Sequence, residues 1–529
     1  MRAPGRRTRC LIPEQLSRPL LAQHRHHRSR TGDRPPPAKT SRERESIMTL
    51  KMEPAATKVD LSDRVFKQLI DGQLVDGASS QPVIDPAIGE AFAVAPVADE
   101  SQADAACIAA ARAFVDWQKT GMAERTQILH QLAQRIEERS TEIARIITLE
   151  NGKPIAAAEG DVDAALTWLR HVAELRLDPE VLREDDESRI EIHRKPIGVV
   201  LAIIPWNFPF FQTIYKLAPA LLAGNTIVIK PAPTTPLNAM LVAEMVQDLV
   251  PAGVVNVLGD GGDLGPYLSA HDAVDKVSFT GSTAAGRKVM ASGADTIKRV
   301  VLELGGNDGA VVLDDADIPT VAQGIFEGAF WNSGQVCINI KRIFVHASQY
   351  DEFCDELARL ANNAKIGPGL DPDNEFGPLQ NARQLEVAKK ALDIAARDGK
   401  IIAGGNLVDA PGYFVQLTVV RDIDDASALV AEETFAPVRS VLKYEDLDEV
   451  VERVNGTEFG LGNSVWGSDV ERAAAVAQRL ESGTVWVNTH CAVAPDVPFG
   501  GRKQSGLGVE FGMDGLLEFT GSCVIHIAK

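Results

Sequence analysis

Ile197-Gly198-Val199-Val200-Leu201-Ala202-Ile203-Ile204 and the later run Thr226-Ile227-Val228-Ile229-Lys230 decide the fold of this chain. Neither run alternates apolar with polar residues, so both predict strands that are buried on both faces. Between them, Tyr215 to Leu222 predicts a short helix that ends at Gly224-Asn225. Buried strands that alternate with helices predict a parallel sheet covered on both faces, and such a sheet binds ligands at the carboxyl ends of its strands.

The same alternation continues along the chain. A helix over 237–249 and strands over 254–258 and 274–279 extend the first sheet. A second alternation begins after about residue 308, with strands over 309–313 and 341–346 and with helices before Cys337 and over 348–363. The sequence therefore predicts an α/β protein with a second α/β domain.

The residues before the first run predict a hairpin followed by helices. Phe66 to Val75, with Asp71-Gly72 at its centre, has the pattern of a hairpin. The helices are expected from an N-cap at Ser101 to Trp117, over 123–150 with a stop at Asn151-Gly152-Lys153-Pro154, and over 156–175. Residues 178–195 predict a protruding hairpin. Residues 522–527 predict a terminal strand that has no partner nearby in sequence, and such strands often pair with another subunit.

Composition is that of an ordinary globular protein. The 529 residues predict roughly three domains, or two large ones, with 45% hydrophobic and 24% charged residues. The six cysteines are scattered without pairing or metal-like spacing, so we expect a reducing, cytoplasmic compartment, no disulfide framework and no metal site. No apolar run reaches the roughly 18 residues of a membrane span, so no membrane partner is expected.

The charge is distributed unevenly. Residues 1–47 hold twelve Lys and Arg against four Asp and Glu, which leaves −27 for the rest of a chain whose net charge is −19. So acidic a body is a poor partner for nucleic acid, and none is expected. The arm 1–60 lacks apolar periodicity and is expected to be disordered. It is either an organellar leader or, as we favour, a dispensable tail or a start assigned ahead of Met48 or Met52.

Phe330-Trp331-Asn332-Ser333-Gly334-Gln335-Val336-Cys337 ends in a cysteine that follows small and polar residues. A lone cysteine is most often a small buried hydrophobe. In an open pocket it can instead be a nucleophile, provided that something lowers the pKa of the thiol or removes its proton. An activated thiolate would be alkylated at neutral pH, and other motifs favour this interpretation.

Several of the first sheet's strands end in polar or glycine-rich clusters. Pro205-Trp206-Asn207-Phe208-Pro209 offers an amide that could face an oxyanion. Lys230-Pro231-Ala232-Pro233 offers a lysine for a ribose hydroxyl or a phosphate. Phe279-Thr280-Gly281-Ser282-Thr283-Ala284-Ala285-Gly286 places glycine at a helix start, where backbone N–H groups can approach a phosphate. Singly, each cluster is explained equally well by a helix cap or a solvated strand end.

Two further glycine-containing stretches follow strands. In Leu302-Glu303-Leu304-Gly305-Gly306-Asn307, apolar neighbours are expected to raise the pKa of Glu303, which suits a general base, although an ordinary loop carboxylate is the alternative. Gly259-Asp260-Gly261-Gly262-Asp263-Leu264-Gly265 resembles a dinucleotide loop, but its spacing is not G-x-G-x-x-G and its aspartates would repel phosphate. We expect this loop to lie near a bound nucleotide without cradling its phosphates.

Taken in order, these clusters resemble the NAD(P)-dependent aldehyde dehydrogenase superfamily from about residue 65 to the C-terminus. Gly334-Gln335-Val336-Cys337, Glu432-Glu433-Thr434-Phe435 and Pro498-Phe499-Gly500-Gly501 complete the pattern. The resemblance implies an α/β fold with a parallel-sheet, Rossmann-like NAD(P)-binding domain, an α/β catalytic domain and a small β oligomerisation element that joins subunits into a homodimer or homotetramer. The expected boundaries are 61–175 and 196–305 for the first, 306–510 for the second, and 176–195 and 511–529 for the third.

The resemblance also implies roles for individual residues. Cys337 attacks the aldehyde carbonyl, the Asn207 amide and the Cys337 backbone N–H hold the oxyanion, and hydride transfer leaves a thioester on the sulfur. Glu303 activates the water that hydrolyses this thioester to the acid. The residues implied to bind the cofactor are Trp206, Lys230, Gly281, Ser282, Glu433 and Phe435.

Cofactor preference and substrate are less constrained. Pro233 stands where many NAD-preferring relatives carry a glutamate that binds the adenine ribose, so NAD is the expected cofactor and NADP stays open. An apolar aldehyde tunnel is expected from Phe208, Phe211, Tyr215, Val336 and Ile338, with His490 and Cys491 near its mouth. Two alternatives remain. One is an acylating dehydrogenase that passes the thioester to coenzyme A, which Glu303 argues against. The other is a non-catalytic protein on the same fold.

Overall fold

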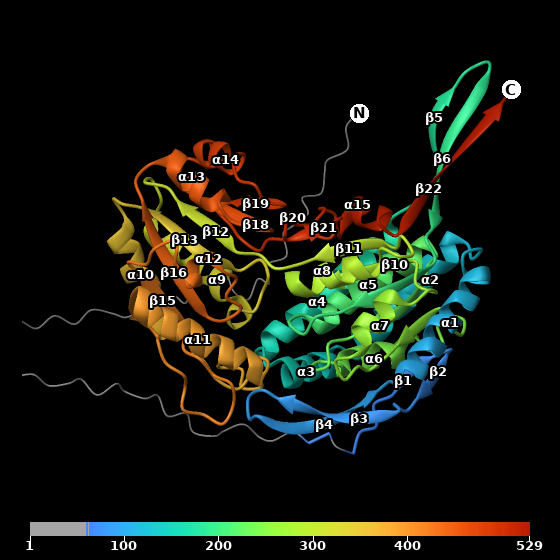
Figure 1. Ribbon diagram of the computed structural model, residues 1–529, viewed down its shortest axis with the longest axis horizontal. Helices are drawn as coiled ribbons and strands as arrows, with labels where there is room; N and C mark the ends of the chain where they lie inside the picture. The colour runs from blue at the N-terminus through green and yellow to red at the C-terminus, as the bar shows by residue number, and fades with distance from the viewer. Residues whose placement is uncertain (1–59, 62) are drawn as a thin grey trace, which may run out of the picture.

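Two large sheets and a projecting three-stranded arm make up the molecule (Figure 1). The structure is a computed structural model that describes residues 60–61 and 63–529. The predicted basic arm lies outside these residues, apart from Asp60. Among the described residues, no helix combines the length and the apolar character needed to cross a membrane.

The first sheet has both apolar runs at its centre. Its order is β2-β1-β9-β8-β7-β10-β11-β21, and the five strands from β9 to β11 are parallel, as predicted. Every residue of β7 and β8 is buried. The strands are β1 (Gln68–Ile70), β2 (Gln73–Val75), β7 (Val199–Ile203), β8 (Thr226–Lys230), β9 (Val255–Val257), β10 (Lys276–Thr280), β11 (Arg299–Glu303) and β21 (Gly506–Leu507).

Helices cover both faces of this sheet. One apolar layer is formed with α2 (Met122–Glu138), α3 (Ser140–Asn151), α4 (Ile155–Glu174), α5 (Pro209–Ala223) and α6 (Leu237–Val246). The opposite layer is formed with α1 (Glu100–Trp117), α7 (Leu264–Ala270) and α8 (Thr283–Ser292). The doubly covered parallel sheet predicted from the apolar runs is confirmed.

The second sheet has the order β14-β15-β16-β13-β12-β18-β19. Its strands are β12 (Asp308–Val312), β13 (Ile340–His346), β14 (Lys400–Ala403), β15 (Thr418–Arg421), β16 (Val438–Tyr444), β18 (Gly462–Trp466) and β19 (Thr484–Val487). On one face lie α9 (Ile318–Phe330) and α10 (Tyr350–Asn363). On the other lie α11 (Ala382–Asp398), α12 (Ala428–Ala431), α13 (Leu447–Asn455) and α14 (Val470–Ala477).

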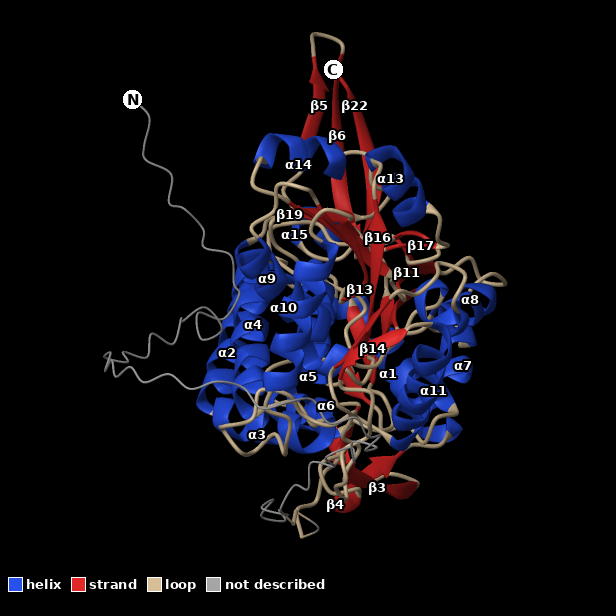
Figure 2. Ribbon diagram, turned by 90° about the vertical axis from the view of Figure 1, so that its left-hand side faces the viewer, coloured by secondary structure: helices blue, strands red, loops and turns tan. Residues whose placement is uncertain are grey.

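A narrow sheet projects from the body beside the first sheet (Figures 1 and 2). It contains β5 (Glu180–Glu184), β6 (Ser188–Pro196) and the terminal strand β22 (Thr520–Ala528), which follows α15 (Gly512–Leu517). The protruding hairpin is confirmed. The terminal strand pairs with β6 of its own chain from Thr520↔Pro196 to Ala528↔Ser188 and forms one edge of this sheet. The remaining pairs are β3 (Ser79–Asp85) with β4 (Glu90–Val97) and β17 (Phe459–Gly460) with β20 (Arg502–Lys503).

Three helix predictions were wrong at their boundaries. The first helix is capped by Asp99, whose carboxylate accepts from Gln102 N, and not by Ser101. The helix expected over 123–150 is two helices that meet at Arg139, where φ is −108° and ψ is 11°. The helix expected from Tyr215 begins at Pro209, because proline favours the first helical position.

Candidate active site

The carboxyl ends of the central strands meet in register at one edge of the first sheet. Lys230 on β8 lies opposite Ile203 on β7, and Ile203 lies opposite Phe279 on β10. Thr280, the next residue of β10, lies opposite Glu303 on β11. The predicted clusters therefore lie side by side, as the parallel sheet required.

Cys337 follows a turn with an unusual backbone. Asn332, Ser333 and Gly334 all have positive φ, at 50°, 53° and 78°. Such conformations are costly for residues other than glycine and persist only where surrounding contacts hold them. Here Ser333 Oγ donates to Gly377 O at 2.7 Å, and Gln335 Oε1 accepts from Gln380 N at 2.9 Å. The turn leaves Cys337 partly exposed between the two sheets.

Asn207 is buried and is tied to the cysteine turn. Its Nδ2 donates to Gln335 O at 3.1 Å, two residues before Cys337. Its own carbonyl accepts from Lys153 Nζ at 3.1 Å and from the side-chain amides of Asn151 and Asn332 at 3.3 Å each. Three donors on one carbonyl fix the backbone from which the amide projects, so the structure brings Asn207 to the turn before Cys337 in a defined orientation.

Glu303 is 4% exposed, and neither carboxylate oxygen has a hydrogen-bond partner within the described part of the chain. Burial raises its pKa well above the usual value, and nearby Glu510 raises it further, while Lys216 opposes the shift. The buried Lys216 Nζ bonds Glu510 at 2.7 Å and Ser278 Oγ at 2.8 Å. The rise in the pKa of Glu303 agrees with the prediction from its apolar neighbours. The ion pair of Lys216 with Glu510, which also affects this pKa, was not predicted from the sequence.

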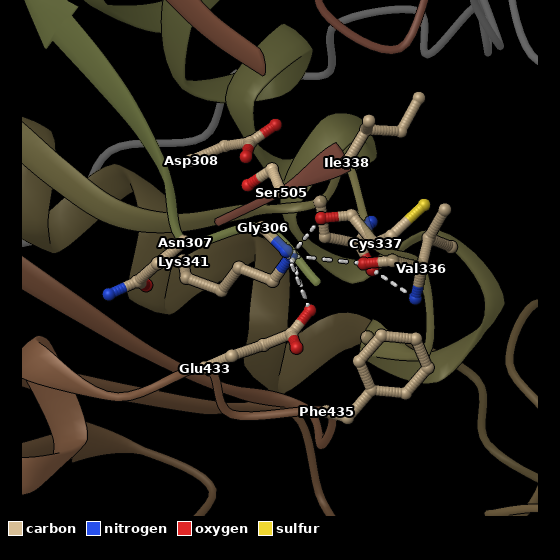
Figure 3. Close-up of polar contacts among 12 residues, drawn as sticks. Gly306, Asn307, Asp308, Val336, Cys337, Ile338, Lys341, Glu433, Phe435 and Ser505 are labelled. Carbon is tan, nitrogen blue, oxygen red and sulfur yellow. Dashed lines mark hydrogen bonds and ion pairs between the residues drawn. The ribbon is translucent and has the colours of Figure 1, made fainter. Parts of the chain in front are cut away.

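The glycine pair after Glu303 lets two other groups approach. A Cβ at Gly305 would lie 2.2 Å from Glu433 Oε2, and one at Gly306 would lie 2.7 Å from Cys337 O. Gly306 N donates to Glu433 Oε1 at 3.1 Å. Lys341 completes this cluster by reaching Glu433 and the backbone around Cys337 (Figure 3). The Leu-Glu-Leu-Gly-Gly-Asn motif thus joins the two sheets at the cysteine.

The predicted cofactor residues line the same edge. Ser282 is the exposed N-cap of α8, whose first turn offers backbone N–H groups, and a Cβ at Gly281 would meet the Phe279 ring at 2.6 Å. The rings of Trp206 and Phe435 lie 5.6 Å apart. A helix N-terminus suits phosphate, a carboxylate such as Glu433 suits ribose hydroxyls, and aromatic faces suit planar rings. This donor set fits a dinucleotide.

Lys230 does not stand alone at its strand end. Its Nζ bonds Asp260 Oδ2 at 2.5 Å, and both side chains are buried. Burial by itself would raise the pKa of Asp260, but Lys230 and backbone N–H groups lower it below its usual value. The Gly259–Gly265 loop therefore lies against the lysine, as expected of a loop near the nucleotide. Gly259, the first glycine of this loop, is required for close packing against β4, because a Cβ at this position would lie 1.8 Å from Pro96 O.

An apolar cluster surrounds the cysteine. Phe208, Val336, Ile338, Leu461 and Trp486 form its buried part, and Phe211, Trp331, Cys491 and Phe499 pack against it. Tyr215 joins through Phe211, with ring centres 5.1 Å apart. The structure thus brings together all five predicted pocket residues. His490 was expected at the tunnel mouth, but it is buried under the cysteine turn, where Nε2 contacts Ile338 O at 2.7 Å and burial lowers its pKa to about 3.

Burial also raises the pKa of the Cys337 thiol to about 12. Lys341 lowers it, whereas Glu433, Glu303 and Asp308 raise it. Burial thus disfavours the thiolate that the sequence predicts, whereas the charge of Lys341 favours it. Sequence motifs could not reveal this, because the effect comes first from burial in the folded protein and then from charges on separate segments.

Three buried lysines near the site lie outside the motifs that predicted it: Lys153, Lys216 and Lys341. Lys153 Nζ lies 3.8 Å from the centre of the Phe208 ring and pairs with Asp161. Each of the three side chains is at most 1% exposed. For Lys216 and Lys341, a lysine within a largely apolar segment was the available signal, because a buried ammonium requires partners.

Known proteins resemble this chain over most of its length. Residues 74–525 match the sequence model of the aldehyde dehydrogenase family. A putative aldehyde dehydrogenase of Bacillus subtilis is 40% identical over 467 residues, which cover 86% of this chain and 94% of that protein. Phenylacetaldehyde dehydrogenase of Pseudomonas fluorescens is 37% identical, covering 87% and 96%. The NAD⁺ complex of an aldehyde dehydrogenase from Bacillus cereus superposes with a TM-score of 0.86 at 35% identity, covering 91% and 99%.

The matching sequence spans the arm as well as both large sheets, and relatives of this identity and coverage share the fold and the reaction class. The α/β fold, with its Rossmann-like cofactor sheet, is the fold of those solved structures. Their use of NAD⁺ agrees with the donor set at the strand edge. This chain therefore belongs to the aldehyde dehydrogenase family and is an NAD(P)-dependent oxidoreductase that acts on aldehydes.

Proposed function

We propose that Cys337, Asn207 and Glu303 carry out the reaction as nucleophile, oxyanion donor and hydrolytic base. The observation that carries this proposal is their convergence: the amide of Asn207 reaches the cysteine turn, and Glu303 is close enough to raise the pKa of the Cys337 thiol. An uncharged amide suits a developing oxyanion. A buried carboxyl with a raised pKa suits a base that works near neutral pH.

The reaction proceeds in two halves. Cys337 Sγ releases its proton to solvent and bonds to the aldehyde carbon, while the carbonyl oxygen becomes an oxyanion held by the Asn207 amide and the Cys337 N–H. Bound NAD(P) supplies the acceptor for the hydride that leaves this carbon. Cys337 then carries a thioester. Glu303 removes a proton from water, the water oxygen bonds to the acyl carbon, and the C–S bond breaks to release the acid and regenerate the cysteine.

The pairing of Lys230 with Asp260 favours NAD over NADP. Pro233 provides no carboxylate near the adenine ribose, but Asp260 places one directly on the lysine. An ammonium that is neutralised by a buried carboxylate attracts a 2′-phosphate weakly, and the carboxylate repels it. Asp260 therefore disfavours the 2′-phosphate of NADP in place of the carboxylate that Pro233 lacks. NAD is accordingly the working cofactor.

The substrate is an apolar aldehyde. The cluster around Cys337 consists of aromatic and aliphatic side chains together with Cys491. Such a lining suits a hydrocarbon or aromatic group. The phenylacetaldehyde specificity in the name of one relative is consistent with this lining.

The projecting sheet joins subunits into a homodimer or homotetramer, and the enzyme works in the reducing cytoplasm. Val181, Leu182, Val524 and Ile527 are exposed on the three-stranded arm. Apolar side chains on a thin projecting sheet are expected to be covered by another surface. Five cysteines are free among the described residues, which agrees with a reducing compartment.

The test is a panel of aldehydes assayed with NAD and NADP in parallel. We expect a higher kcat/KM for phenylacetaldehyde than for an anionic aldehyde such as succinic semialdehyde. We also expect NAD reduction to vanish in Cys337→Ala. The product should be the acid with or without coenzyme A. A thioester product would establish the acylating alternative, and undiminished turnover in Cys337→Ala would refute the assignment of the nucleophile.

A further inference from the structure

Lys341 is a buried cation directly beside the proposed nucleophile. It is the second residue of β13, and its side chain is 1% exposed. Its Nζ donates to the carbonyl oxygen of Val336 at 3.1 Å and to that of Cys337 (Figure 3). The same Nζ lies 3.7 Å from Glu433 Oε1. One ammonium thus contacts the peptide groups on both sides of the cysteine and a proposed cofactor ligand.

The contact with Val336 bears directly on the oxyanion site. The carbonyl of Val336 and the N–H of Cys337 belong to one planar trans peptide group, so they point in opposite directions. A cation that holds the carbonyl therefore aims the N–H away from itself. A charge-assisted hydrogen bond to the carbonyl also polarises the peptide, which strengthens the N–H as a donor.

The other contacts tie the cysteine to the strand that carries Glu303. Lys341 links Cys337 O to Glu433, and Glu433 accepts from Gly306 N at 3.1 Å. Gly306 lies three residues after Glu303. This chain of bonds joins the nucleophile on the second sheet to the base on the first, across the gap where the aldehyde must bind.

The charge of Lys341 also opposes the carboxylates that surround the Cys337 sulfur. The groups with the largest electrostatic effect on the Cys337 thiol come from four segments and, besides Lys341, are all carboxyls: Glu303 at the end of β11, Asp308 on β12 and Glu433 after α12. Two further titratable groups interact with it, Tyr215 on α5 and Cys491 after β19. Among these described groups, Lys341 carries the positive charge. Its loss would therefore leave the Cys337 thiolate surrounded by carboxylates without a compensating cation.

We infer that Lys341 is a positioning residue of this enzyme: it aims the Cys337 N–H at the oxyanion and stabilises the thiolate by its charge. This inference rests on the function proposed above. Lys341 touches neither the carbonyl carbon nor the hydride, and it acts through Cys337 and Glu433.

The test measures the sulfur itself, in the cofactor-free full chain. Iodoacetamide modification of Cys337 is followed by peptide mass spectrometry between about pH 7.5 and 9.5, because the rate reports the thiolate fraction. Lys341→Met removes the charge and the donor, whereas Lys341→Arg keeps both. Lys298→Met is the matched control, since Lys298 is also buried and its Nζ donates to two carbonyls, those of His271 and Val274, at 2.9 Å each. Lys298 precedes β11 at the end of that strand away from Glu303.

We expect Lys341→Met to be alkylated roughly 10-fold more slowly than the wild type at each pH, because a tenfold smaller thiolate fraction corresponds to a thiol pKa that is higher by about one. Lys341→Arg should stay within about threefold of the wild-type rate, and Lys298→Met should match it. In aldehyde turnover, Lys341→Met should lower kcat on the order of 10²-fold, as the loss of an oxyanion donor does. Its effect should not multiply with that of Asn207→Ala, because both changes act on one oxygen.

Two results would overturn the inference. One is a Lys341→Met alkylation profile that overlays the wild type. The other is a folded Lys341→Arg that is alkylated as slowly as Lys341→Met, which would deny a role to the charge. Both readings are independent of aldehyde oxidation. A Lys341-dependent thiol in a protein that oxidises no aldehyde would therefore refute the proposed function and leave the effect of Lys341 on the thiolate intact.

Discussion

At the scale of the residue, the site contains titratable groups that are buried among apolar side chains. Cys337, Glu303 and Asp308 all have raised pKa values, and burial is the first cause of each. Burial therefore disfavours the charged forms of these groups. The proposed chemistry needs the thiolate of Cys337 and the carboxylate of Glu303, so the site is expected to lower stability in exchange for reactivity.

Glu303→Gln is predicted to be more stable than the wild type at neutral and alkaline pH. The raised pKa of Glu303 means that its protonated form is favoured by folding, so its stabilisation is present at low pH. That contribution is lost as pH rises from the unfolded pKa near 4.5 to the folded pKa, by about 1.4 kcal/mol for each pH unit between the two values. Thermal unfolding from about pH 4.5 to 9 measures this loss. The variant's advantage should grow with pH, and a constant difference would contradict the burial of a titrating carboxyl.

Asp260→Asn is predicted to weaken the preference for NAD. Asparagine can still accept the backbone N–H groups of Gly262 and Asp263, so the loop should keep its fold, while Lys230 loses its counter-ion. The ratio of the Kd for NADP to that for NAD should fall about tenfold, equivalent to ~1.4 kcal/mol. Calorimetric titration of the free protein with each dinucleotide measures the ratio. An unchanged ratio would show that Asp260 does not set the preference between NAD and NADP.

Sequence reasoning performed well for residues that stand in motifs and poorly for those that do not. Asn207, Glu303, Cys337 and Glu433 were singled out because each stands in a recognisable motif, and the structure brings them to one edge. Lys341 and Lys216 were missed because their partners are backbone carbonyls or a carboxylate 294 residues away. The raised pKa of Cys337 could not be predicted either, because it depends first on burial in the folded protein and then on charges from distant segments.

At the scale of the element, the connection between β11 and β12 depends on its glycines. Gly305→Ala is predicted to displace Glu433, because the new methyl group would lie 2.2 Å from its Oε2. We expect the free energy of unfolding to fall by about 1–3 kcal/mol, as overpacking does, and the Kd for NAD to rise. Chemical denaturation and titration with NAD measure the two effects.

Gly121→Ala is the control for that variant. Gly121 precedes α2 with a φ of −63°, and an added Cβ would meet no heavy atom of the described residues within 4 Å. This substitution should change stability by less than about 1 kcal/mol. Equal losses in the two variants would show that close approach of Glu433 is not what Gly305 provides.

Element types were predictable because long apolar runs have few structural solutions, whereas element ends depend on single contacts. The strands at 199–203 and 226–230 were found nearly to the residue. The break at Arg139 was missed because residues on both sides of it keep helical apolar spacing. Arg139 itself is held by ion pairs to Glu142 and to the distant Glu244.

At the scale of the whole molecule, the arm is the part without a hydrophobic core of its own. Its terminal strand covers β6 of the same chain and leaves Val524 61% exposed. Val524→Asp is predicted to dissociate the proposed oligomer without unfolding the subunit, since most of the side chain is exposed within the chain. Light scattering after size exclusion measures the mass, and circular dichroism checks the fold.

The control is Val470→Asp, at an equally exposed valine (58%) that begins α14 on the body. That variant should keep the wild-type mass. If Val524→Asp keeps it too, the arm does not join subunits. The sequence could predict the arm from its charged, alternating strands, but it could not predict the register between β22 and β6, because pairing across more than 300 residues leaves no local signal.

The most direct test of the central claim is to trap the acyl enzyme. Glu303→Gln should react once with phenylacetaldehyde and NAD, release about one equivalent of NADH per site and then stop, because the thioester forms but the base that hydrolyses it is absent. Peptide mass spectrometry of the quenched protein should find the acyl group on the peptide that carries Cys337. An acyl group on another residue, or steady turnover without an adduct, would contradict the assignment of Cys337 and Glu303.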